Sequence, residues 1–91
     1  MAKFVIIGLD GPEGQARRKI HREAHIERLS NLAKEGKIIL AGPFTDGSGS
    51  LIVVEAASLE EAEALAEEDP YMTGKVFQKV EVKPFMQVFP S

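Results

Sequence analysis

The hydrophobic and polar positions of this chain change period several times, and the short apolar runs predict strands. Three runs rich in Val and Ile meet this description: "KFVIIGL" (3–9), "KIILAGPF" (37–44) and "LIVVEAA" (51–57). In a fourth segment, "VFQKVEVKPF" (76–85), valines alternate with charged residues, as in a strand with one solvated face. We therefore expect four strands.

Two longer segments have the helical period instead. The first runs from about Gln15 to Glu35 and is followed by a glycine, a common C-terminal stop. The second is "SLEEAEALAEED" (58–69), in which Ser58 and Glu61 have the spacing of a capping box. Pro70 should end this helix, because the residue before a proline is disfavoured in the α region.

The predicted order is β-α-β-β-α-β, which indicates an α+β, ferredoxin-like fold: one antiparallel four-stranded sheet with two helices on one face. Strands 3–9 and 51–57 are apolar on both faces, although helices would cover only one. The tail "PFMQVFP" (84–90) adds further apolar side chains that a small monomer can hardly bury. We expect a homodimer or higher homo-oligomer with sheets packed face to face.

Length and composition narrow the functional classes. The chain has 91 residues, enough for one domain over 1–91, with 44% hydrophobic and 27% charged residues. Its net charge of −3 argues against nucleic acid as a partner, and zero cysteines exclude disulfides and thiol nucleophiles. No apolar run approaches the ~20 residues that span a bilayer, and the N-terminus lacks a signal-peptide pattern. We expect a cytoplasmic protein without membrane contact.

The first helix places a histidine on its inner face. At ~100° per residue, His25 falls inside the apolar arc that contains Leu29 and Leu32. Arg18 and Arg22 lie in the same arc nearer the N-terminus, whereas the other histidine, His21, sits at its margin. Polar groups directed at a sheet need partners or water, so this half of the helix should border a cleft.

The second helix offers a partner for His25. Asp69 continues the row of inner residues at the C-terminal end of this helix, where the helix dipole disfavours a carboxylate unless a cation is near. The two helices of this fold run antiparallel, which brings the His25 end of one towards Asp69 of the other. The pattern predicts a His–Asp pair, which could equally be a structural hydrogen bond that fixes helix packing.

Other motifs have plainer interpretations. His21 and His25 share one side of a helix, but the segment lacks the HExxH order and offers only Asp69 as a third ligand, so we predict no metal site. Arg18 and Arg22 belong to a basic run that is typical of a solvated helix start but could also hold an anionic substrate. No phosphate-loop spacing is present, and no motif implies a cofactor.

The chain also resembles a known family. The segments "HREAHIERLSNLAKEGKIILAGPF", "GSLIVVEAASLEEAEALAEEDPY" and "VEVKPF" together are similar to the YciI-like (YCII-related) family over nearly the whole chain. The resemblance implies a ferredoxin-like, dimeric α+β barrel fold and an active site built on a His–Asp pair. The family histidine falls on His25, the aspartate on Asp69, and the serine of the "GS" element on Ser50. A related enzyme acts on a chlorinated hydroxyquinone-type aromatic.

These observations favour a small-molecule enzyme. His25 would act as general acid/base, with Asp69 orienting its ring, in elimination, isomerisation or hydrolysis of a small oxygenated or aromatic compound. Ser50 and the amides around Gly49 could bind a substrate oxygen. Two alternatives remain open: a non-catalytic small-ligand-binding or accessory dimeric module, and a purely structural dimer with a satisfied polar cluster.

Overall fold

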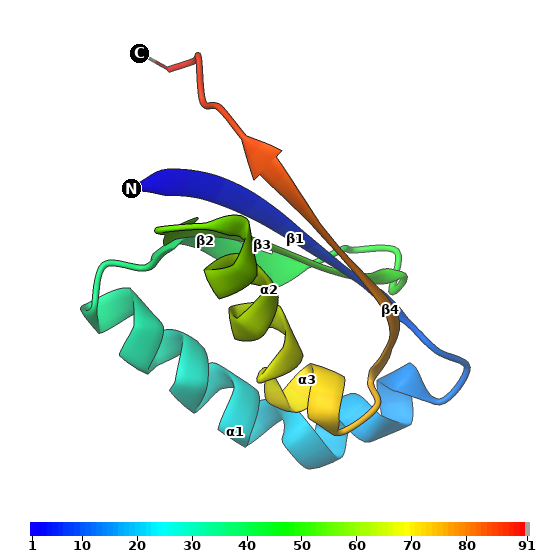
Figure 1. Cartoon of the computed structure of the whole chain (residues 1–91). Helices are drawn as coiled ribbons and strands as arrows, with labels where there is room; N and C mark the ends of the chain where they lie inside the picture. Colours follow the sequence, from blue (N-terminus) through cyan, green and yellow to red (C-terminus); the bar gives the residue numbers. More distant parts are fainter. Residues whose placement is uncertain (91) are drawn as a thin grey trace.

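An antiparallel sheet with all of its helices on one face forms the protein (Figure 1). The computed structural model describes residues 1–90 and confirms the ferredoxin-like α+β arrangement. Its elements, in chain order, are β1 (Ala2–Asp10), α1 (Gly14–Lys34), β2 (Ile38–Pro43), β3 (Gly49–Ala56), α2 (Leu59–Glu67), α3 (Pro70–Thr73) and β4 (Phe77–Phe85).

The sheet has the strand order β2-β3-β1-β4, and every neighbouring pair is antiparallel. β1 lies in the middle, with Ile6 opposite Ile52 of β3 and Val82 of β4. Successive side chains of a strand point to opposite faces, so the inward row of β1 is Phe4, Ile6, Gly8 and Asp10. The pairing shifts by one residue between Leu9 and Asp10, which sets Asp10 opposite Phe77.

The hydrophobic core lies between the sheet and the helices. Its sheet side consists of inward residues of β1 and β3, and its helix side is supplied by α2 and by the C-terminal half of α1. The buried members are Phe4, Ile6, Ile52, Val54, Ala56, Ala62 and Ala66, against which Leu29 of α1 packs. α2 faces the sheet with alanines, and small side chains let it approach the sheet closely. The buried residues of α1 itself are Gly14, Arg18 and His25, none of which belongs to this core.

The structure corrects the expected end of the second helix. The predicted cap at Ser58 is present, since its Oγ accepts a hydrogen bond from the Glu61 amide at 3.1 Å. However, α2 ends at Glu67, and Pro70 is the first residue of the additional short helix α3. Proline is well suited to this position because it has no amide hydrogen that would need a partner.

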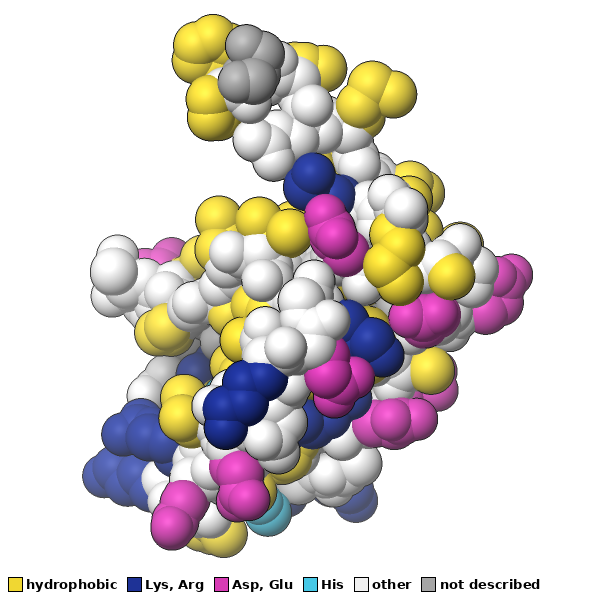
Figure 2. All heavy atoms as spheres, turned by 90° about the vertical axis from the view of Figure 1, so that its left-hand side faces the viewer, with side chains coloured by type: hydrophobic (Ala, Val, Ile, Leu, Met, Phe, Trp, Pro, Cys, Tyr) yellow, Lys and Arg dark blue, Asp and Glu magenta, His cyan; other side chains and the backbone are white. Residues whose placement is uncertain are grey.

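Beyond the sheet, the chain continues as a projecting segment at the C-terminus (Figure 1). Apolar side chains gather on this segment (Figure 2), and Met86 and Phe89 are at least 80% exposed. Within residues 1–90, no helix is both long and apolar enough to cross a membrane.

Candidate active site

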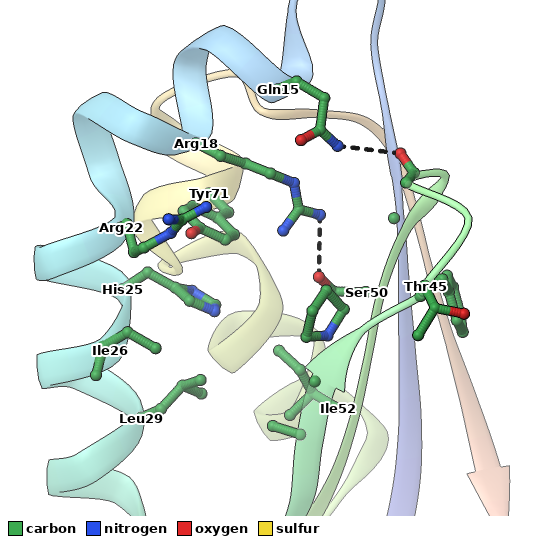
Figure 3. A pocket seen from close by; sticks show the side chains of 16 residues that line it. Gln15, Arg18, Arg22, His25, Ile26, Leu29, Thr45, Ser50, Ile52 and Tyr71 are labelled. Carbon is green, nitrogen blue, oxygen red and sulfur yellow. Dashed lines mark hydrogen bonds between the residues drawn. The ribbon is translucent and has the colours of Figure 1, made fainter.

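A cavity of 490 Å³ opens between the N-terminal half of α1 and the end of the β2–β3 hairpin (Figure 3). Its apolar wall includes Ile26 and Leu29 from α1 and Ile52 from β3, while polar side chains from α1, β3 and α3 gather at its other end. These polar lining residues are Gln15, Arg18, Arg22, His25, Ser50 and Tyr71. Helix and hairpin are joined at the rim, where Gln15 Nε2 donates to the Gly47 carbonyl at 3.2 Å.

His25 and Asp69 form a short, buried pair at the back of this cavity. His25 Nδ1 lies 2.7 Å from Asp69 Oδ1, and the two residues are 6% and 2% exposed. An ionised carboxylate can only accept a hydrogen bond, so we assign the ring hydrogen to Nδ1. The neutral imidazole then keeps its lone pair on Nε2, and the ring points into the cavity (Figure 3).

The position of Asp69 differs from the sequence expectation. Asp69 does not extend α2 but is the N-cap of α3, where Oδ1 also accepts the Tyr71 amide hydrogen at 2.8 Å. A carboxylate is favourable at a helix N-terminus, so the penalty expected from the dipole of the preceding helix does not arise. The guanidinium of Arg28 approaches the other oxygen, with Nη1 3.6 Å from Oδ2.

Tyr71 packs against one face of the His25 imidazole. Its ring is stacked on His25 with the centroids 3.8 Å apart and the planes 7° from parallel. Tyr71 in turn meets the edge of Phe77 at a centroid distance of 5.8 Å. Phe77 fits because a side chain at Gly8 would occupy the place of its ring. The orientation of His25 is thus fixed through hydrogen bonding by Asp69 and through packing by Tyr71.

A buried ion pair between Arg18 and Asp10 lies on the other side of the site. Arg18 binds Asp10 twice, from Nε to Oδ2 at 2.7 Å and from Nη2 to Oδ1 at 2.8 Å. Its Nη2 also donates to Ser50 Oγ at 3.0 Å (Figure 3). Hydrogen bonding to Asp10 raises the pKa of Arg18 above its ordinary value, although burial alone would lower it. Arg18 is therefore a cation at neutral pH.

The remaining predicted residues border the same cavity. Arg22 is exposed at its mouth, and no salt bridge joins it to another of the described residues. Gly49 lies in the wall, where a Cβ would collide with the Gly8 carbonyl oxygen. No carboxylate side chain lines this cavity in the described part of the chain, so its charged rim is basic in a protein of net charge −3.

His21 lies apart from these groups. It does not line the cavity, and its ring packs against Gly74, where a Cβ would collide with it. Across residues 1–90, no group of three or more His, Cys, Asp or Glu side chains is placed to hold a metal ion. The two histidines, one helical turn apart, therefore have different surroundings, and only His25 reaches the cavity.

Three residues of the site were missed from the sequence. Asp10 could have been found, because it continues the inward row of β1 and so faces the same side as Ser50 of β3. Gln15 and Tyr71 gave no such signal. The role of Tyr71 depends on α3, a four-residue helix too short to produce a periodic pattern.

Comparison with known proteins points to one family. A family model described as the YCII-related domain matches residues 2–86. Protein YciI of Escherichia coli O6:H1 is 36% identical over 94% of this chain and 98% of its own length. An uncharacterized protein of Haemophilus influenzae is 33% identical with the same coverage.

Two solved structures are similar in fold. The 5-chloro-2-hydroxyhydroquinone dehydrochlorinase TftG of Burkholderia phenoliruptrix, in complex with 2,5-dihydroxybenzoquinone, superposes with a TM-score of 0.81 and 27% identity over 93% of this chain and 94% of that one. A NIPSNAP family protein of Agrobacterium tumefaciens has a TM-score of 0.54 and 19% identity over 99% and 94% of the two chains, and so shares the fold alone.

Proposed function

The chain belongs to the YCII-related domain family, and from this premise we propose that it is a small-molecule enzyme in which His25 transfers a proton. One observation carries the proposal: the imidazole is held at Nδ1 by Asp69 at 2.7 Å while its other nitrogen is left for a ligand in a 490 Å³ cavity. This is the arrangement of an oriented general base.

In the proposed reaction, His25 Nε2 removes a proton from the substrate and later returns it to substrate or solvent. The imidazolium formed in between lies against the Asp69 carboxylate and the face of Tyr71, and both stabilise a positive charge. A positioned acid/base of this kind typically accelerates a reaction by about 10²–10⁴-fold.

The rest of the cavity suits a small, oxygen-bearing substrate. Ser50, together with backbone around Gly49, is proposed to bind a substrate oxygen, Arg22 to attract an anionic group, and Arg18, which is paired with Asp10, to support Ser50. The apolar wall of Ile26, Leu29 and Ile52 would accept a flat carbon skeleton. The aromatic substrate of TftG supports this class of compound. The proposed chemistry is the elimination, isomerisation or hydrolysis of a small oxygenated or aromatic compound.

The test uses a matched pair of histidine variants. Wild type, His25→Gln and His21→Gln are incubated in D2O with a panel that begins with 5-chloro-2-hydroxyhydroquinone and 2,5-dihydroxybenzoquinone. Chloride release and the loss of carbon-bound proton signals are followed by ion electrode and NMR. We expect turnover of at least one compound, lowered about 100-fold or more by His25→Gln and changed less than about threefold by His21→Gln.

Equal effects of the two substitutions would refute the role of His25, provided that circular dichroism shows both variants folded. Binding of a panel compound without turnover by any of the three proteins would instead support the non-catalytic ligand-binding module. The control is informative because His21 has the same side chain on the same helix but does not line the cavity.

We also propose that the protein is a homodimer. The face of the sheet opposite the helices carries apolar residues on its two central strands, with Ile7 opposite Leu51 and Val5 opposite Val53. The projecting apolar segment at the C-terminus lies next to the end of this sheet (Figure 1). Contiguous apolar surface of this kind usually marks an interface, and a second copy of the chain offers a face of matching character.

A further inference from the structure

Three hydrogen bonds from Arg18 connect Asp10 to Ser50. The single hydrogen on Nε goes to Asp10 Oδ2, and the two hydrogens on Nη2 go to Asp10 Oδ1 and Ser50 Oγ. All three distances lie between 2.7 and 3.0 Å, and the Arg18 and Asp10 side chains are only 7% and 6% exposed. The guanidinium plane therefore has one orientation.

This network decides which way the Ser50 hydroxyl points. A guanidinium has no acceptor, so Ser50 Oγ must accept from Arg18, and the single hydroxyl hydrogen must point elsewhere. Within residues 1–90, no side chain or carbonyl accepts that hydrogen. Ser50 is 3% exposed and lines the cavity, so its hydroxyl hydrogen is available to a ligand bound in the cavity.

The anchor of this network is built into the backbone. Asp10 is the last inward residue of β1, and its carboxylate lies against Gly14, the first residue of α1. A Cβ at Gly14 would stand 2.7 Å from both Cβ and Oδ2 of Asp10. The glycine thus leaves the space in which the carboxylate meets Arg18.

We infer that Asp10 and Arg18 are positioning residues that hold Ser50 as a hydrogen-bond donor to an oxygen of the bound ligand, and not as a nucleophile. The inference rests on the proposed function and adds that Ser50 binds the ligand oxygen by donating a hydrogen bond to it. A ligand that fits this donor has a carbonyl, phenolate or enolate oxygen at Ser50. The Asp10 carboxylate offsets the charge of Arg18, so among the described residues that line the cavity the unpaired cation is Arg22 at the mouth.

The residue types Ser50, His25 and Asp69 would also suit an acyl-transfer triad, and the geometry argues against that assignment. A nucleophilic serine donates its hydrogen to the histidine base. Here Ser50 Oγ receives a hydrogen bond from a cation, which draws electron density from the oxygen and makes the hydroxyl a better donor. No hydrogen bond between Ser50 and His25 is found among the described residues.

A double-mutant cycle tests the inference. The dissociation constant of 2,5-dihydroxybenzoquinone is measured by isothermal titration for wild type, Ser50→Ala, Arg18→Lys and the double variant. Lysine keeps the charge but cannot make the forked contact. We expect Ser50→Ala to weaken binding about tenfold in wild type and less than about twofold in the Arg18→Lys background, because the donor has already lost its orientation.

Two further variants complete the design. Asp10→Asn provides a second background, in which the effect of Ser50→Ala should fall below about threefold. This variant takes the place of Arg18→Lys if the Arg18→Lys protein does not fold. Arg17→Lys is the matched control, since the neighbouring Arg17 pairs only with Glu13 at the surface, and the Ser50→Ala effect should stay near tenfold in its presence. Equal effects of Ser50→Ala in all backgrounds would show that Arg18 and Asp10 are merely structural.

The nucleophile alternative is tested without any ligand. Intact-mass analysis after treatment with a fluorophosphonate should show no adduct on Ser50, and labelling of Ser50 would overturn the inference. If the quinone does not bind wild type, it is the proposed substrate class that fails. The hydroxyl orientation is then decided by neutron diffraction on the unliganded protein: deuterium directed into the cavity supports the inference, and deuterium directed at His25 refutes it.

Discussion

At the scale of single residues, one oxygen atom of Asp69 has two functions. Asp69 Oδ1 caps α3 by accepting the Tyr71 amide hydrogen, and it also accepts the Nδ1 hydrogen of His25. The cap places Tyr71 directly after Asp69, so the same turn that positions the carboxylate also positions the ring that stacks on the imidazole. The local sequence "DPY" therefore specifies both supports of His25.

Asp69→Asn removes the negative charge while leaving one oxygen that can accept both hydrogen bonds. Asparagine caps helices about as well as aspartate, and Arg28, which loses Asp69 as a partner, still has Glu68 at 3.8 Å, so the free energy of unfolding should fall by only about 1 kcal/mol. The neutral amide oxygen can keep both hydrogen bonds, but it no longer offsets the positive charge of the imidazolium that forms during proton transfer. We expect turnover to drop about 100-fold or more, measured beside urea denaturation.

Glu68→Gln is the control for this change, because Glu68 is the exposed neighbour that faces Arg28 at 3.8 Å. It should alter turnover and stability little. If Asp69→Asn instead unfolds the protein while Glu68→Gln does not, the His–Asp pair is chiefly structural. Retained activity in a folded Asp69→Asn protein would remove Asp69 from the mechanism.

How far residues can be predicted from the sequence depends on whether they follow a regular row. The inward direction of His25 followed from the helical period, and that of Ser50 is consistent with the alternation in β3. The hydrogen-bond partner of Arg18 was not predicted, because the β1–α1 turn determines where Asp10 meets it. The stack of Tyr71 on His25 was not predicted, because it depends on α3, a helix too short to show a period in the sequence.

At the scale of elements, apolar periodicity predicted all four strands and both long helices, with boundaries within about two residues. The short helix α3 was not predicted. Four residues give no period, and the proline that signals the end of one helix is also well suited to begin the next. Asp69 was thus predicted at the C-terminal end of the second helix, whereas it is the N-cap of α3.

The start of α1 provides a test at this scale. Gly→Ala within a helix normally stabilises it by about 1 kcal/mol. Gly14→Ala should do the opposite and lower the free energy of unfolding by about 1–3 kcal/mol, because the new methyl group would displace the Asp10 carboxylate from Arg18. Gly42→Ala, which meets no atom within 4 Å, should be nearly neutral. Thermal denaturation of both variants measures the difference, and a stabilised Gly14→Ala protein would contradict the proposed fit.

At the scale of the whole molecule, the two faces of the sheet carry different surface features. The helix-covered face contains the cavity, and the open face with the C-terminal segment contains apolar surface without a cover (Figures 1 and 2). β4 adds Lys79, Glu81 and Lys83 to the open face, so this surface has a charged margin beside its apolar centre. An apolar centre with a charged rim is the usual anatomy of a protein–protein interface.

The proposed dimer predicts a mass of about twice the 9.9 kDa chain in light scattering after gel filtration. Leu51→Lys places a charge in the middle of the open face and should yield a folded monomer, because burying an unpaired ammonium group at an interface is costly. Ile20→Lys, on the exposed side of α1, should leave the mass unchanged. A wild-type mass of one chain at about 100 µM would rule out the dimer.

The Leu51→Lys monomer also shows whether the two faces work independently. The cavity lies on the opposite side of the sheet from Leu51. The monomer should therefore bind 2,5-dihydroxybenzoquinone within about threefold of wild type, apart from any loss of stability. If binding is instead lost in a folded monomer, the partner subunit must complete the site, and the exposed apolar C-terminal segment, which projects beyond the sheet (Figure 1), is the part of the chain to truncate next.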